Sequence, residues 1–153
     1  MSLLAAITTR YLDAATAAGF PTVGATTPRE MQGVALPAFF LRLFRVRDYM
    51  VSPGMDPQQI RAEVEVVVVT SEPEDAPAVQ AGPLAGQAFG GLAGAQAAHD
   101  IALRVIGEAE GRPTRMGQYA GPYAGRDVIV TGIVSEAHAD VWANPGPLSD
   151  LAQ

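Results

Sequence analysis

The clearest alternation of apolar and polar residues lies in the stretch 60–70, IRAEVEVVVVT. Ile60 and every second residue after it up to Val68 are apolar, which places them together on one face of a β-strand. The opposite face carries charged residues first and then Val67 and Val69. We therefore predict a strand that begins half exposed, ends buried on both faces, and needs neighbouring strands and a helical cover.

Two further segments have the composition of strands. Leu36–Arg47, LPAFFLRLFRVR, is apolar on both faces and predicts an interior strand, joined to 60–70 as a hairpin through a long, flexible loop at about 48–59. Arg126–Ser135 predicts the last strong strand, and its polar continuation carries Glu136, His138 and Asp140 on one face. A bulge or a change of neighbour near Gly132 or Ser135 would explain the change from apolar to polar residues on that face.

Two segments have helical periodicity. Ser2–Ala18 predicts an amphipathic helix with Ser2 as its N-cap; Gly19 stands where a left-handed residue ends a helix, and Phe20 follows it. The second helix is predicted mainly over Leu92–Glu108, because the glycines just before Leu92 disfavour an earlier start. Its core stripe is formed by Ala98, Ile101, Ala102 and Val105.

The remaining segments are predicted to be connections. Pro21–Gly33 contains Thr27-Pro28-Arg29-Glu30, which predicts one short helical turn; a short edge strand at Thr22–Ala25 is the alternative. Gly111–Gly125 predicts a connector with a short extended piece at Thr114–Tyr119. The acidic, proline-rich stretch at about 71–91 is expected to be functional or mobile, and residues from about 143 to 153 are expected to form a tail.

This order of elements predicts one α+β domain over residues 1–153. Its sheet is small and mainly antiparallel, and the two helices pack on one face of it.

Composition excludes several kinds of chemistry. The chain has no cysteine, and all ten of its basic residues are arginine, so thiol catalysis, cysteine-bound metals and lysine-based catalysis are excluded. The formal net charge of −6 argues against a surface built to bind phosphates or anionic lipid. No basic leader or long apolar run is present, so we expect a soluble protein made in the cytoplasm.

Few polar residues form a plausible reaction centre. Glu136, His138 and Asp140 would share one strand face and offer metal-binding atoms, although an exposed strand face carries such residues by default. The neighbouring His99 and Asp100 are not expected to face each other on a helix. The glycines 90, 91 and 94 lack the preceding buried strand that a phosphate-binding turn requires. We therefore predict no catalytic residue, no cofactor and no metal.

Two clusters combine the residue types that are enriched at protein–protein contacts. The first consists of Arg42, Arg45, Arg47, Tyr49 and Met50, and the second, looser one of Arg112, Arg115, Met116, Tyr119 and Tyr123. The alternative is that these arginines are merely the exposed ends of strands that pair with nearby carboxylates. We take the two clusters as the candidate protein interface.

The layout of the whole chain resembles the tail terminator, or tail-completion, proteins of tailed phages and gene transfer agents (the gp37-like and minor-tail-U-like groups). The resemblance covers about residues 3–134. It rests on an N-terminal helix ending in AGFPTV, then LPAFFLRLFRV, a turn, RAEVEVVVVT, an acidic proline-rich loop, an alanine-rich helix and a closing strand.

The resemblance implies a virion structural protein of the tail–neck region that forms a hexameric ring on the tail tube. Such a ring ends tube polymerisation and offers a joining surface to the head connector, so its partners are further copies of itself, the tail tube protein and the neck protein. DNA would only pass through the lumen, with no sequence-specific binding and no membrane contact. The alternatives are a head–tail connector of the same build and, in another class, a small metal-dependent enzyme using Glu136, His138 and Asp140.

Overall fold

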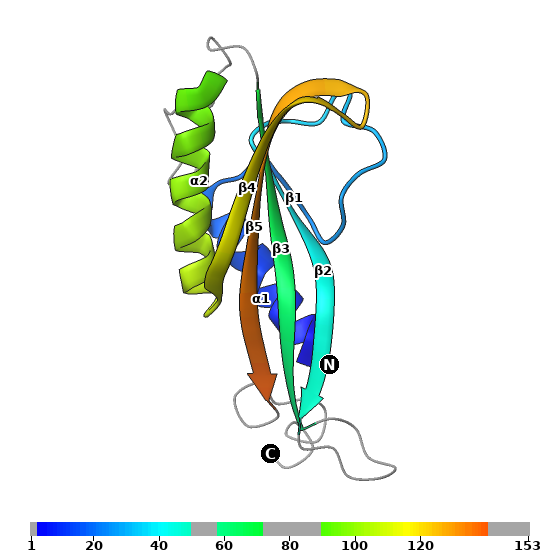
Figure 1. Cartoon of the computed structure of the whole chain (residues 1–153), viewed down its shortest axis with the longest axis vertical. Coiled ribbons are helices and arrows are strands. Elements are labelled where there is room, and N and C mark those ends of the chain that lie inside the picture. The colour runs from blue at the N-terminus through cyan, green and yellow to red at the C-terminus, as the bar shows by residue number, and fades with distance from the viewer. Residues whose placement is uncertain (1–2, 50–57, 72–89, 141–153) are drawn as a thin grey trace.

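The computed structural model describes residues 3–49, 58–71 and 90–140. Its elements, in chain order, are α1 (Leu3–Ala18), β1 (Thr22–Gly24), β2 (Ala38–Tyr49), β3 (Gln59–Ser71), α2 (Gly91–Glu108), β4 (Arg112–Tyr123) and β5 (Arg126–Asp140). The strands form one five-stranded sheet in the order β1-β2-β3-β5-β4. Both helices lie on the same side of this sheet (Figure 1). The predicted α+β class is confirmed.

The sheet is antiparallel except for the pairing of β1 with β2. The two central strands β3 and β5 pair in one unbroken register from Gln59 opposite Asp140 to Ser71 opposite Val128. The predicted antiparallel hairpin of β2 and β3 is confirmed, and most of the loop that joins them lies outside the described residues.

The main core lies between the helices and the sheet. Alternate residues of β3 from Ile60 to Val68 point into it, as their spacing predicts, and are nearly or fully buried. α2 contributes mainly small side chains that allow close packing, among them Ala98 and Ala102, and α1 adds the larger Ile7 and Tyr11.

The end of α1 follows the prediction. Gly19 has a φ of 102°, a left-handed conformation that only glycine adopts at little cost. The N–H of Phe20 donates to the carbonyl of Ala15 at 3.4 Å, which is the long-range bond of the helix-ending motif. Phe20 is buried against Phe39 of β2, with ring centroids 5.3 Å apart.

A second, smaller apolar cluster covers one end of the opposite sheet face. It contains Met31, Ala38, Phe40, Val67, Val69 and Val128. Val34 and Leu36, from the segment between β1 and β2, pack against it. The sheet face opposite the helices is called the open face below, because this cluster covers only one of its ends.

Two predicted connections are strands in the structure. At Thr22–Gly24 the alternative prediction is right: these residues pair with Ala38–Phe40 as β1, and the predicted helical turn at Thr27–Glu30 is absent. The predicted connector Gly111–Gly125 is wrong, because β4 pairs with β5 along its length. Its extended piece at Thr114–Tyr119 is correct but too short.

An irregularity does lie near Ser135, as predicted, but the extra residue belongs to the neighbouring strand. No register shift separates β3 and β5, whereas the pairing of β4 with β5 shifts between Pro113, opposite Ser135, and Arg115, opposite Val134. The last strand itself therefore has no bulge. The even residues of β5 face the open side throughout, and they turn polar where the second apolar cluster ends. A shift between Leu43 and Arg45 in β2 instead moves Val46 to the helical side, opposite Ala62, and brings Arg45 to the open face. β2 has a neighbour on both sides only at Ala38–Phe40, so the predicted interior strand is correct for that end alone.

The loop predicted at about 71–91 and the tail predicted at about 143–153 fall almost wholly outside the described residues. Neither helix in the described part of the chain has the length and apolar character needed to cross a membrane.

Candidate protein interface

The structure brings both predicted arginine clusters onto the open face. Residues opposite each other on neighbouring antiparallel strands point to the same face, so the strand register defines rows across the sheet. One row runs Arg42, Glu65, Val134, Arg115, and the next runs Arg45, Glu63, Glu136, Arg112. A third row runs Arg47, Arg61, His138. Tyr49, at the end of β2, lies over this face as well, whereas Met50 lies outside the described residues.

In the first two rows an arginine lies next to a carboxylate, and two such neighbours form ion pairs. Arg42 Nε lies 3.5 Å from Glu65 Oε1, and Arg112 Nη2 lies 3.5 Å from Glu136 Oε2. The guanidinium of Arg61 lies 5.6 Å above the ring centre of Tyr49. The alternative prediction of strand-end arginines that pair with nearby carboxylates is therefore correct for Arg42 and Arg112. Such exposed pairs contribute little to stability, so this arrangement leaves the face available for binding.

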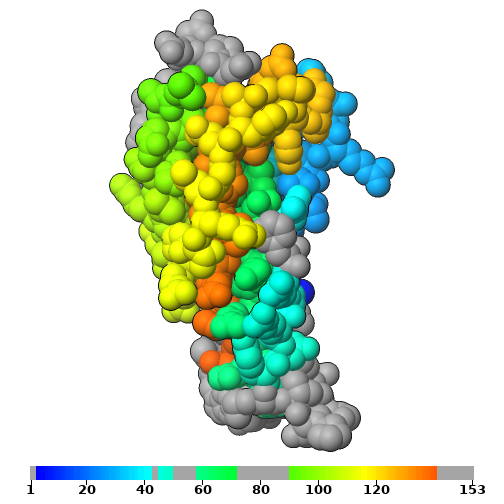
Figure 2. Space-filling view, viewed as in Figure 1, coloured from blue at the N-terminus to red at the C-terminus, as the bar shows by residue number. Residues whose placement is uncertain are grey.

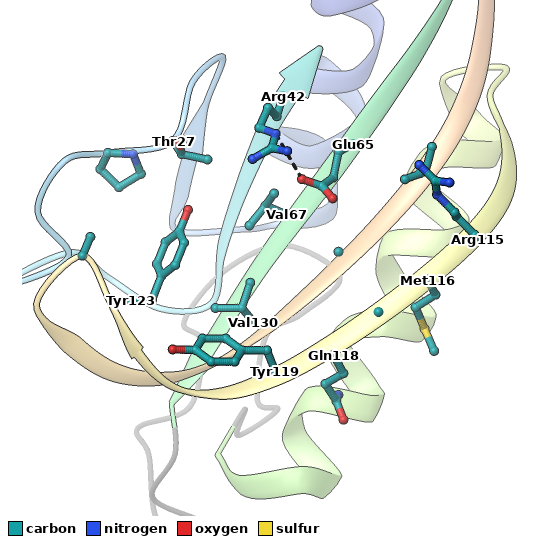
Figure 3. Close-up of a pocket in the computed structure, with 15 residues that line it drawn as sticks. Thr27, Arg42, Glu65, Val67, Arg115, Met116, Gln118, Tyr119, Tyr123 and Val130 are labelled. Atoms are coloured by element: carbon teal, nitrogen blue, oxygen red, sulfur yellow. Dashed lines mark ion pairs between the residues drawn. The ribbon is translucent and has the colours of Figure 1, made fainter. Parts of the chain in front are cut away.

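A groove of about 680 Å³ crosses the open face beside these rows. Its walls come from the β4–β5 hairpin, with Tyr119 and Tyr123, and from the segment before β2, with Thr27 and Pro28. Figure 2 shows the hairpin and that segment next to each other at one end of the molecule. In the close-up, the two tyrosines lie on one side of Val67 and Val130, and the Arg42–Glu65 pair lies on the other (Figure 3).

Exposed apolar side chains accompany this groove. Tyr119 is 48% exposed and its side chain lies on the open face. Met116 is 57% exposed and borders the groove, but it lies opposite Ile133, so its side chain points to the helical side at the edge of the sheet. Tyrosine, methionine and arginine are over-represented at protein interfaces, and an apolar centre with a charged rim is the usual anatomy of such a site.

The sheet also has long edges without a partner strand in the described part of the chain. β4 forms one edge, and all its residues from Arg112 to Ala120 are exposed. β2 forms the other edge beyond Phe40, where β1 ends. The backbone N–H and C=O groups of such an edge offer a template for another strand.

The residues of the rival metal site gain no support from the geometry. Glu136, His138 and Asp140 do share the open face, but Glu136 pairs with Arg112. Among the described residues, no group of three or more histidine, aspartate and glutamate side chains is placed to hold a metal ion. The expectation for His99 and Asp100 is wrong, because Nδ1 of His99 lies 3.6 Å from Oδ1 of Asp100. Gln96 Nε2 donates to the same carboxylate at 3.0 Å, and this exposed cluster lies on α2, away from the groove.

Sequence reasoning missed the residues that join the two clusters. Arg61, Glu63 and Glu65 belong to the most regular strand, whose pattern identifies them only as its polar face. Gly117 and Gly132 face each other in the floor of the groove. The alternation in 60–70 does indicate that the three charged residues of this strand share one face. The pairing of the two glycines cannot be predicted from the sequence, because it depends on the register of β4 against β5.

No protein-family model matches this chain, and no curated protein matches it at a significant level.

Proposed function

We propose that this chain is a non-enzymatic assembly protein of the phage tail terminator type, which closes a ring of identical copies at the end of a tail tube. The observation that carries the proposal is a sheet with two long edges, on β2 and β4, that have no partner strand in the described residues. The resemblance of the chain to tail terminators gives the ring its place in the virion.

The directions of the two edge strands suit a ring. Three antiparallel pairings separate β2 from β4, so the two edges run in opposite directions. A second copy, rotated about an axis roughly along the strands, would place its β2 antiparallel to β4 of the first copy. Because this contact joins two different surfaces, it repeats from copy to copy, and it closes when the rotation divides a full turn.

In this proposal the ring ends polymerisation of the tube and presents a surface to the neck protein at the head. The arginine and tyrosine side chains of the open face supply contacts beyond the strand edges. A head–tail connector of the same build would use the same surfaces, and no feature of the described residues favours it over a terminator.

Sedimentation velocity over a wide concentration range tests the proposal. We expect a discrete species of about six protomers that forms without intermediate sizes. A closed dimer or trimer would contradict the ring. If the chain stays monomeric, the measurement is repeated with isolated phage tail tubes, and failure to sediment with them would contradict the proposal too.

A further inference from the structure

The floor of the groove contains a gap over Gly117 of β4. Gly117 lies directly opposite Gly132 of β5, and Val67 of β3 continues the same row. A Cβ atom added at Gly117 would meet nothing within 4 Å, and one added at Gly132 would meet a carboxylate oxygen of Glu65 at 3.2 Å. The space over Gly117 is therefore open, whereas the Glu65 side chain reaches over Gly132 from β3.

The aromatic ring nearest to this gap along β4 does not cover it. In sheets, an aromatic side chain often lies across a glycine of the neighbouring strand. Tyr119 instead donates its hydroxyl proton to the carbonyl of Pro122, and it lies over Gly121, where an added Cβ would meet its hydroxyl oxygen at 3.2 Å and its ring carbon Cζ at 3.4 Å. Tyr119 is thus turned toward the end of the hairpin, away from the paired glycines.

The side chains around the gap define what would fit it. Val67, Val130 and Val134 line the groove with apolar surface. The charged side chains that line it are two guanidinium groups, Arg42 and Arg115, and one carboxylate, Glu65. An apolar floor with a positive rim favours a flat or long apolar group that has carboxylates next to it.

We propose that this groove binds an extended segment of another protein, in which an aromatic side chain flanked by carboxylates fills the gap over Gly117, next to Gly132. The proposal rests on the assembly role proposed above, because it names the kind of partner that the assembled chain would bind. The carboxylates beside the aromatic group would lie near Arg115 and would compete with Glu65 for Arg42, which pairs with it in the structure.

A second copy of this chain fits the groove less well. The exposed large apolar side chains of the described residues are Val46, Leu92, Met116 and Tyr119. None of them has an acidic neighbour in the chain, and Val46 stands between Arg45 and Arg47. The described surface has an adjacent acidic and aromatic residue at Asp48-Tyr49, but Tyr49 is only partly exposed and already contacts the guanidinium of Arg61.

The test is a titration of the ¹⁵N-labelled full chain, followed by NMR, with the capped peptide Glu-Glu-Phe-Glu-Glu. We expect saturable shifts of the backbone amide signals of Gly117 and Gly132. The peptides Lys-Lys-Phe-Lys-Lys and Glu-Glu-Ala-Glu-Glu serve as controls for charge and for the ring, and both should bind at least about tenfold more weakly. Absence of shifts at the two glycines, or equal binding of the lysine peptide, would overturn the proposal.

Two variants locate the binding. Gly117→Val fills the gap, and it suits the strand because the position has open space and valine favours extended backbone. We expect it to weaken peptide binding at least about tenfold, whereas Gly107→Ala, at an exposed position of α2 with equal space, leaves binding unchanged. Arg115→Glu should shift the preference toward the lysine peptide. Unchanged binding in both groove variants would contradict the proposed site.

Sedimentation of Gly117→Val separates this inference from the proposed function. We expect the variant to assemble as the unaltered chain does, since its β4 backbone edge is intact. Loss of assembly would assign the groove to a second copy and overturn the inference while the ring stands. If the unaltered chain binds the peptide at the two glycines but forms no ring, the proposed function is contradicted and the inference about the groove stands.

Discussion

At the scale of single residues, the hydroxyl of Tyr11 forms the polar centre of the core. Tyr11 is fully buried on α1, and its Oη lies 2.7 Å from Oγ of Ser135 on β5. The Ser135 hydroxyl in turn lies 3.4 Å from the carbonyl oxygen of Val64 on β3. Burial raises the pKa of Tyr11 above 10.0, although the bond to Ser135 and the nearby Arg10 act in the opposite direction.

Tyr11→Phe should lower the free energy of unfolding by about 1–2 kcal/mol near neutral pH, because it removes one buried hydrogen bond. Above pH 10.0 the unfolded tyrosine ionises while the folded one keeps its proton, so the unaltered chain loses stability as pH rises. The difference in the free energy of unfolding between the unaltered chain and Tyr11→Phe should therefore narrow. Urea unfolding at about pH 8 and about pH 11 measures this difference, with Tyr49→Phe on the open face as the control. A difference that stays constant across this range would contradict a buried, protonated Tyr11.

Gly111→Ala should destabilise the fold by about 1–3 kcal/mol, since its added Cβ would overlap the Tyr11 hydroxyl and crowd Ile106. Part of this cost should disappear in the Tyr11→Phe background, where the overlapping oxygen is absent. A double-mutant cycle by urea unfolding measures the coupling, which we expect to be about 1 kcal/mol. Additive effects would mean that the two residues do not touch.

At the scale of elements, the sequence predicts those whose pattern reflects burial. β3 is predicted to within one residue at each end, because its alternate residues enter the core. α2 begins one residue earlier than predicted. β4 was predicted as a connector because it is exposed over most of its length and contains Gly117, Gly121 and two prolines, which are rare in strands.

The candidate interface, too, is predicted from the sequence only in part. Both arginine clusters are predicted from composition, but their position on a single face depends on the pairing of β2 with β3 and of β5 with β4. The gap in the groove depends on the register that sets Gly117 opposite Gly132, which are fifteen positions apart in the chain. Local patterns contain no information on such distant pairing.

The edge of β2 allows a test of the assembly contact. Val46 is 42% exposed beyond the end of β1, and Val46→Lys would add a charge that blocks the addition of another strand. We expect the variant to keep its fold but to lose the assembled species in sedimentation velocity.

Leu92→Lys is the matched control, because it also replaces an exposed apolar residue, 70% exposed, but on α2. The control should assemble normally. Assembly of Val46→Lys at the concentration that the unaltered chain requires would exclude the β2 edge from the contact.

At the scale of the whole molecule, charge is unevenly distributed. Seven of the ten arginines lie on the open face, namely Arg42, Arg45, Arg47, Arg61, Arg112, Arg115 and Arg126. The open face of the described strands carries four carboxylates: Glu63, Glu65, Glu136 and Asp140. This face therefore has a positive excess in a chain whose formal net charge is −6. The arginines of β2 and β4 lie near opposite edges, so the proposed ring contact brings like charges together.

This distribution predicts opposite effects of salt on the two proposed interactions. Ring closure joins copies of equal net charge and places arginine-bearing strands side by side, so screening should favour it. Raising sodium chloride from about 0.1 M to about 1 M shortens the screening length from about 10 Å to about 3 Å. The concentration for half-assembly in sedimentation velocity should then fall by at least roughly threefold. Binding of the acidic peptide should instead weaken, because it pairs unlike charges. Assembly that weakens with salt would mean that the ring contact joins the arginine-rich face to acidic surface rather than β2 to β4.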